Sequence, residues 1–213
     1  MLLSTRQLIP SIHLLLASTS PRRKELMNNL GIPFTVLAAP IDEQMPVSDF
    51  DSIPQYVEAL AMKKAIAAAN LVASNNETDK YDIIVSADTV VVFEGKIFGK
   101  PSSSEDAINT LSKLSGKTHS VITGVCLRVR KPSSGDSFIT FHEVTTVKMA
   151  RLERCVIEAY VNSGEPLDKA GAYGIQGLGC SLVEKIDGDY FNVVGLPIYK
   201  LCKHIHDLLH DAS

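Results

Sequence analysis

One short segment of the sequence concentrates groups that bind anions. Residues 18–23 read Ser-Thr-Ser-Pro-Arg-Arg and follow an apolar run, Leu14 to Ala17, that is typical of a short buried strand. Ser20 is a good helix N-cap and Pro21 suits the first helical position, so the pattern predicts a strand, a turn and a helix start. Free N–H groups at a helix start, hydroxyls and two guanidinium groups together form a cradle for phosphate. An ordinary helix cap followed by solvated arginines is the alternative interpretation.

A lone acidic residue interrupts a second apolar run. Asp88 lies between residues 82–87 and residues 90–93, and both segments have the character of strands. A buried carboxylate without a partner is costly, so a cation, a metal ion or hydrogen-bond donors must lie beside it. A structural aspartate that caps a turn is the other interpretation of the same pattern.

Two further segments are candidates, and the first of them carries little information by itself. Lys100 stands in a tight Gly-Lys-Pro turn, although a surface lysine is the default explanation for it. Residues 171–179 contain four glycines, which let a backbone approach a ligand closely or adopt positive φ angles. The alanine, tyrosine, isoleucine and leucine interleaved with these glycines indicate a loop that packs, which favours binding over a flexible surface role.

The elements that must position these residues alternate between strand and helix. The patterns predict strands at 14–17, 34–37, 82–87, 90–93, 96–98, 121–130, 138–149 and 182–186, and helices at 22–30, 54–73, 106–114, 151–161 and 197–209. The stretch 164–179 is expected to be a glycine-rich loop. This alternation, interrupted by a hairpin, predicts a mixed α/β (α+β) domain in which helices flank one curved mixed sheet.

Length and composition exclude several classes of protein. The chain has 213 residues, with 21 Lys and Arg against 24 Asp and Glu, which suits one soluble domain rather than a nucleic-acid or membrane coat. Four scattered cysteines without a Cys-x-x-Cys pair fit a reducing compartment. The apolar run from Leu8 to Leu16 is interrupted by a proline and a histidine, so we do not expect a cleaved signal peptide or a membrane span.

Taken together, the motifs resemble the Maf family of nucleotide pyrophosphatases over nearly the whole chain. The resemblance rests on segments that match family motifs in order: Leu15 to Leu26, Ser86 to Val91, Gly99 to Pro101, Leu114 to His119, Glu165 to Gly177 and Asn192 to Pro197. It implies a fold of the ITPase and Maf type with a cleft between two lobes. The domain is expected at residues 13–210, after an N-terminal extension of residues 1–12 to which no function is assigned.

The activity that the resemblance implies is hydrolysis of a nucleoside triphosphate to the monophosphate and pyrophosphate, with Mg²⁺ or Mn²⁺ as cofactor. Arg22, Thr89 and Gln176 resemble the subgroup associated with dTTP and UTP, and CTP or modified uridine nucleotides also fit it. The subgroup associated with 7-methyl-GTP has other residues at these three places. The resemblance therefore predicts a small-molecule nucleotide substrate, and no nucleic-acid polymer or membrane as partner.

The resemblance also assigns roles to individual residues. Asp88 is expected to be the general base that deprotonates water, a metal ligand, or both, and Glu43 is the expected second metal ligand. The substrate-binding residues would be Ser18, Arg22, Arg23, Lys64, Lys100 and Gln176. Residues 60–65 resemble a helical lysine motif of the family, and either Lys63 or Lys64 could be the lysine that points into the site. An amide such as that of Gln176 offers both a donor and an acceptor to a uracil-like base.

A second class of function stays open beside the enzyme. A catalytically silent nucleotide-binding protein that regulates cell division would need the cations, but it would not need a buried base such as Asp88. The resemblance further implies a homodimer, a cytoplasmic location and a role in controlling nucleotide pools.

Overall fold

Seven strands form a mixed sheet in the computed structural model, which describes residues 12–43, 45–75, 81–131 and 135–211. The strands are β1 (Leu14–Leu16), β2 (Phe34–Val36), β3 (Ile83–Phe93), β4 (Lys96–Phe98), β5 (Thr118–Val129), β6 (Ser137–Met149) and β7 (Val183–Asp187). They pair in the order β2-β1-β3-β5-β6-β7, and β4 also pairs with β3. β1 is parallel to β2 and β3, whereas the pairs β3–β4 and β6–β7 are antiparallel.

The helices fall close to their predicted positions. They are α1 (Pro21–Asn29), α2 (Ile53–Ser74), α3 (Ser104–Leu114), α4 (Arg154–Asn162), α5 (Tyr190–Val194) and α6 (Ile198–Asp211). Short 3-10 helices occur at η2 (Val47–Asp49), η4 (Glu165–Asp168), η5 (Ala170–Ala172) and η6 (Gly177–Leu182). The expected mixed α/β class, with a mixed sheet flanked by helices, is confirmed. The stretch expected to be a glycine-rich loop instead contains η4, η5 and the start of η6, and α5 was not predicted.

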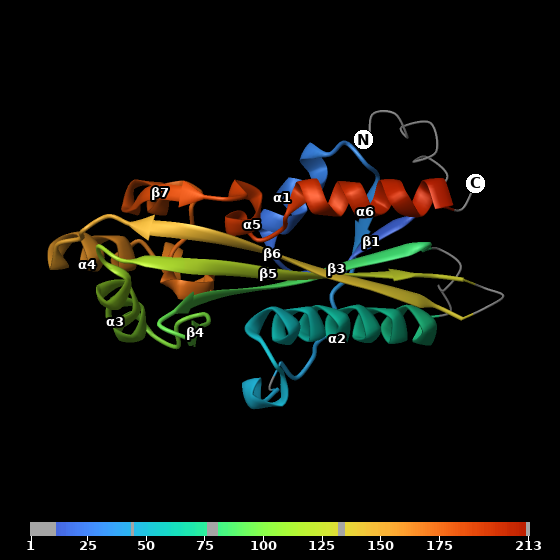
Figure 1. Cartoon of the computed structure of the whole chain (residues 1–213), viewed down its shortest axis with the longest axis horizontal. Coiled ribbons are helices and arrows are strands. Elements are labelled where there is room, and N and C mark those ends of the chain that lie inside the picture. Colours follow the sequence, from blue (N-terminus) through green and yellow to red (C-terminus); the bar gives the residue numbers. More distant parts are fainter. Residues whose placement is uncertain (1–11, 44, 76–80, 132–134, 212–213) are drawn as a thin grey trace. The chain divides into compact units, whose positions relative to one another are not determined.

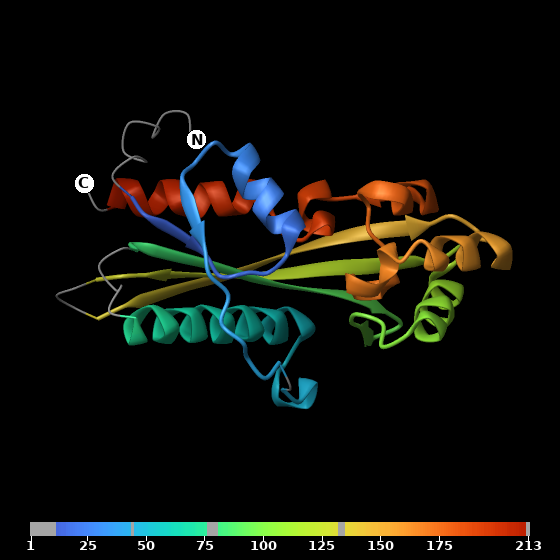
Figure 2. The same ribbon diagram turned by 180° about the vertical axis from the view of Figure 1, so that it is seen from behind.

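The described chain divides into two compact units. The first contains the described residues up to Asp88, together with residues 123–142 and the chain from Gly195 onward. In this unit α2 lies on one face of the strands, and α1 and α6 lie on the other (Figures 1 and 2). Alanines and a valine of α2 pack on Leu15, Ile84 and Cys126, which are buried on the sheet. This packing fixes the face of α2 that is turned toward β3.

The second unit contains residues 89–122 and 143–194. Its core joins β3, β5 and β6 to α3 and α4, with Leu111, Met149 and Ile157 among the buried residues. Tyr160 and Tyr173 belong to the same core. The glycine-rich stretch thus packs through Ala172 and Tyr173, as the interleaved apolar residues predicted.

Residues 1–11 of the expected N-terminal extension lie outside the described residues, and the boundaries of a 13–210 domain stay a prediction. The curvature of the sheet and the cleft between lobes also stay predictions. Among the described residues, no helix is long and apolar enough to cross a membrane.

Candidate active site

The strand, turn and helix start predicted around residues 18–23 are present, with the turn at the start of α1. Ser20 is the N-cap, and its side chain accepts a hydrogen bond from the backbone N–H of Arg23, with Pro21 in the first turn. Ser18 Oγ accepts from the backbone N–H of Ser20 at 3.2 Å. The chain leaves β1 at Ala17, whose N–H donates to the carbonyl of Val85 on β3. The turn before α1 is therefore anchored to the strand that carries Asp88.

Arg23 is held in place by several groups around it. Its Nε donates to the carbonyl oxygen of Gly195 at 2.8 Å, and its Nη1 donates to Ser18 Oγ at 3.4 Å. Burial lowers the pKa of Arg23, the charge of Asp88 works to raise it, and the neighbouring charge of Arg22 lowers it further. A guanidinium group keeps its charge at neutral pH, so this site is cationic and partly desolvated.

Two contacts join β3 to α2 and place the catalytic candidate. The hydroxyl of Ser86, which is fully buried, donates to the carbonyl of Ala61 at 2.6 Å. Two residues further along β3, Oδ1 of Asp88 lies 2.6 Å from Nζ of Lys64. Ser86 and Asp88 share a face of the strand, and Ala61 and Lys64 are one helical turn apart. Asp88 is 9% exposed, so Lys64 supplies the partner that burial of this carboxylate demands.

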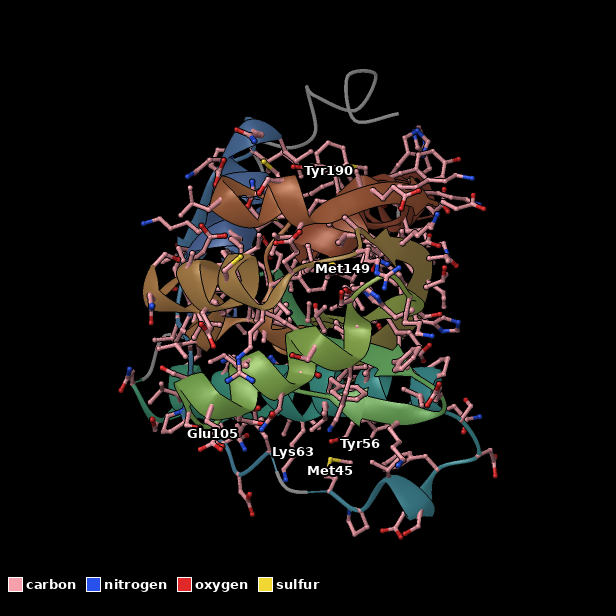
Figure 3. The ribbon with its side chains drawn as sticks, turned by 90° about the vertical axis from the view of Figure 1, so that its left-hand side faces the viewer. Met45, Tyr56, Lys63, Glu105, Met149 and Tyr190 are labelled. Carbon is pink, nitrogen blue, oxygen red and sulfur yellow. The ribbon has the colours of Figure 1, made fainter. Side chains whose placement is uncertain are left out.

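Lys64 also reaches the second carboxylate that was predicted. Its Nζ lies 2.9 Å from Oε1 of Glu43, while Lys63 makes no such contact with either acid among the described residues. Of the two lysines, Lys64 is therefore the one that pairs with both predicted carboxylates, and its role as the substrate-binding lysine stays a prediction. Figure 3 labels Lys63 and Tyr56 on α2, on the side of the helix toward the segment that carries Met45.

Tyr56 is a member of this cluster that sequence reasoning missed. Burial raises the pKa of its phenol, and the negative charges of Asp88 and Glu43 raise it further. Tyr56 stands in the first turns of α2, two helical turns before Lys64, so its phenol group faces the same carboxylates. A polar aromatic residue at that spacing from the lysine is the signal that could have identified it.

The two carboxylates offer a chemically suitable place for a divalent cation. No group of three or more His, Cys, Asp or Glu side chains with metal-binding geometry occurs in the described part of the chain. Mg²⁺, however, usually takes only one or two protein carboxylates and completes its shell with water and phosphate oxygens. Glu43 and Asp88, which meet at the same ammonium nitrogen, are a donor pair of that kind.

The remaining predicted residues belong to the second unit. Thr89 follows Asp88 directly on β3, and Lys100 is an exposed residue of the turn after β4. The backbone N–H of Gly171 donates to the carbonyl of Gly99 at 3.0 Å, which fixes the turn bearing Lys100 against the glycine-rich segment. Gln176 precedes η6, is partly buried, and does not cap that helix with its side chain.

The structure thus groups the predicted residues into two sets. Ser18, Arg22, Arg23, Glu43, Lys64 and Asp88 lie in the first unit, where hydrogen bonds, ion pairs and charge interactions link them. Three cations and two carboxylates in one partly buried cluster are suited to binding a polyphosphate together with a metal ion. Thr89, Lys100 and Gln176 lie in the second unit.

Comparison with known proteins gives consistent results. The family described as Maf-like protein matches residues 13–208. A protein of Symbiobacterium thermophilum named dTTP/UTP pyrophosphatase is 46% identical over 187 residues, which cover 88% of this chain and 89% of that protein. Proteins with the same name from Bacillus cereus and Thermosipho africanus are each 44% identical and align with 94% of this chain, covering 97% and 93% of their own lengths.

A solved structure supports the fold. The HAM1 protein of Coxiella burnetii superposes with a TM-score of 0.52 at 14% sequence identity, covering 92% of this chain and 99% of that one. This likeness concerns the fold.

Proposed function

Because the chain belongs to the Maf family, we propose that it is a nucleoside triphosphate pyrophosphatase that hydrolyses dTTP and UTP to the monophosphate and pyrophosphate. The observation that carries this proposal is the buried Asp88 carboxylate, paired at 2.6 Å with Lys64 in a cluster that also contains Arg22 and Arg23. A protein that only binds nucleotides needs the cations of this cluster, but it does not need a buried carboxylate among them.

The chain's own residues suggest how the reaction proceeds. The N-terminus of α1, Arg22 and Arg23 bind phosphate oxygens through backbone N–H groups and guanidinium groups. Lys64 occupies Oδ1 of Asp88, so Oδ2 is the oxygen that accepts a proton from the attacking water. The water oxygen forms a bond to the α-phosphorus. The bond between the α-phosphorus and the oxygen that bridges it to the β-phosphorus breaks, and pyrophosphate leaves with the electron pair of that bond. Lys100 neutralises charge on the departing phosphates.

We propose Mg²⁺ or Mn²⁺ as the cofactor, with Glu43 and Asp88 as the residues that would hold it. When bound, such an ion neutralises phosphate charge and polarises the phosphorus that is attacked. Lys64 contacts both carboxylates and offsets one of their two negative charges when no metal ion is bound.

In this proposal, Arg22, Thr89 and Gln176 determine which nucleobase of the substrate is accepted. The amide of Gln176 offers one donor and one acceptor to the edge of a uracil or thymine ring. CTP and modified pyrimidine nucleotides are further substrates in this scheme, and control of nucleotide pools is the cellular role. We also propose a homodimer that acts in the cytoplasm. The four cysteines, all within the described residues, are free thiols, which fits a reducing compartment. Light scattering of the purified protein tests the dimer.

Product analysis tests the proposed function. The protein is incubated with dTTP, UTP, CTP, 7-methyl-GTP or ATP and Mg²⁺ in ¹⁸O-labelled water, and the products are separated. We expect pyrophosphate and a labelled monophosphate from dTTP and UTP, because attack at the α-phosphorus leaves the label there. Binding of dTTP without turnover of any nucleotide would overturn the proposal in favour of a silent nucleotide-binding regulator. Preference for 7-methyl-GTP would keep the chemistry and overturn the assignment of Arg22, Thr89 and Gln176.

A further inference from the structure

The backbone around Gln176 is held by one carboxylate that no assigned catalytic role uses. Oε2 of Glu165 accepts a hydrogen bond from the backbone N–H of Leu178 at 2.8 Å. Oε1 of the same side chain accepts from the backbone N–H of Gly179 at 3.0 Å. Both carboxylate oxygens thus bind the first turn of η6, which begins immediately after Gln176.

A tyrosine links this carboxylate to the other end of the segment. The hydroxyl of Tyr160, a residue only 6% exposed on α4, donates to Oε1 of Glu165 at 3.0 Å. The hydroxyl oxygen of Tyr160 in turn accepts a hydrogen bond from the backbone N–H of Gly174 at 3.1 Å. Residues 174 and 179 are therefore tied to one pair of side chains, with Gln176 between them.

The charge state of Glu165 matches this arrangement. Burial works to raise its pKa, but the hydrogen bonds from Leu178, Gly179 and Tyr160 outweigh that effect and lower the pKa below its ordinary value. The group is therefore a carboxylate at neutral pH, which accepts hydrogen bonds from backbone N–H groups strongly.

Steric contacts confine the same segment. A Cβ atom at Gly179 would lie 2.2 Å from the carbonyl oxygen of Gly174, so the two ends of the segment touch. Gly177 has a φ of +65°, and a Cβ there would lie 2.6 Å from Oε2 of Glu165. The backbone of residues 174–179 is therefore packed closely against itself and against Glu165.

We propose that Glu165 and Tyr160 are positioning residues that fix the backbone of residues 174–179 and thereby aim the Gln176 amide at the pyrimidine base. This inference rests on the proposed function, because it assigns base discrimination to Gln176. It goes beyond that function in naming two residues that never touch the nucleotide and yet set its selectivity.

Kinetics of four variants test the proposal. Glu165→Gln replaces one acceptor oxygen with an NH₂ group that faces a backbone donor, and Tyr160→Phe removes the hydroxyl. For both we expect kcat/KM with dTTP to fall about tenfold, mainly through KM, since hydrogen bonds to a charged group are lost. The preference for dTTP over 7-methyl-GTP should fall toward that of Gln176→Ala. Glu184→Gln, which removes an exposed ion pair with Lys148 in the same unit, is the matched control and should change neither quantity.

A double variant separates positioning from a general structural effect. If Glu165 acts through Gln176, then Glu165→Gln combined with Gln176→Ala should lose no more selectivity than Gln176→Ala alone. Additive losses, or an unchanged nucleotide preference in a folded Glu165→Gln protein, would overturn the proposal.

Hydrogen exchange of backbone amides tests the proposed positioning role without measuring nucleotide hydrolysis. In the free protein, Glu165→Gln should speed exchange of the amides of Leu178 and Gly179 by about tenfold, while α2 stays as protected as in wild type. If wild type hydrolyses no nucleotide, the proposed function fails. The positioning claim is then decided by calorimetric binding of dTTP and 7-methyl-GTP to the same variants. Unchanged exchange at both amides would contradict it directly.

Discussion

Gly124 on β5 lies directly against the backbone of Val57 on α2, so that a Cβ atom at Gly124 would stand 2.4 Å from the Val57 carbonyl carbon. That helix carries Tyr56 next to this contact and Lys64 two turns further on. The distance between α2 and the sheet therefore sets how far the Lys64 ammonium reaches toward Asp88.

Substitution of Gly124 by alanine should displace α2. The added methyl meets backbone atoms, which cannot rotate away, so we expect a loss of about 1–3 kcal/mol in the free energy of unfolding together with a lower kcat. Urea denaturation and steady-state kinetics measure both. Gly99→Ala is the stability control, because a Cβ there has no atom within 4 Å. Equal stability of the two variants would refute the tight helix-to-sheet contact.

The two adjacent lysines of α2 should differ sharply. Lys64→Met leaves Asp88 and Glu43 without their shared counter-ion, so kcat/KM with dTTP should fall about 100-fold or more. For Lys63→Met, one residue away, kcat/KM with dTTP should fall by less than about threefold, which is the effect expected of a change in surface charge. Kinetics on both proteins, with circular dichroism to confirm folding, measure the difference. Losses of similar size would contradict the assignment of Lys64.

Removal of the second carboxylate should weaken the metal site without abolishing the reaction. Glu43→Gln takes away one of two proposed anionic ligands, so the Mg²⁺ concentration for half-maximal activity should rise about tenfold or more, with a smaller change in kcat at saturating metal. Titration of Mg²⁺ into chelator-treated protein measures this. Asp49→Asn, a charge change in η2, is the control, because Asp49 and Lys64, both in the described part of the chain, form no ion pair with each other. An identical Mg²⁺ response in Glu43→Gln and wild type would exclude Glu43 as a ligand.

Acid should destabilise the protein through a buried histidine. His119 is 3% exposed, its Nε2 lies 2.7 Å from the hydroxyl of Tyr173, and burial lowers its pKa to about 4. The unfolded chain takes up a proton at its ordinary pKa of 6.5, whereas the folded chain does not. The free energy of unfolding should therefore fall as pH drops from about 6.5 to about 4, by up to roughly 3 kcal/mol from this residue.

A comparison of pH profiles isolates that contribution. His119→Phe cannot take up a proton, so its stability should depend less steeply on pH between 6.5 and 4 than that of wild type, even if its absolute stability is lower. Urea denaturation at pH 7, 5.5 and 4.5 measures both slopes. Parallel profiles would show that His119 is protonated alike in the folded and unfolded chain.

Local sequence signals predicted the start of α1 but not the continuity of β3. Ser20 and Pro21 carry their own capping chemistry, so the helix began where the sequence indicated. Asp88 read as a polar interruption between two strands, whereas β3 runs unbroken from Ile83 to Phe93. The interruption disappears because Lys64, 24 residues away in sequence, compensates the buried charge. No local pattern carries that information.

Contacts between residues that are distant in sequence also explain why α5 and the order of the glycine-rich segment were not predicted. α5 depends on Asn192, whose side-chain amide donates to the carbonyl of Val121 and to Thr145 Oγ1, both distant in sequence. In the glycine-rich stretch, the composition predicted close packing. The order of that segment comes from Glu165 and Tyr160, which the glycines themselves do not reveal. Side chains that act over long sequence separations are identified only when the fold brings them together.

The most direct test of the central claim is pyrophosphate release from dTTP by wild type and Asp88→Asn. Asparagine keeps the shape of the side chain but cannot accept the proton, so we predict that kcat falls by about 100-fold or more while calorimetry still detects dTTP binding. A folded Asp88→Asn protein that turns over dTTP at the wild-type rate would contradict the account, because the reaction would then need no base at this position.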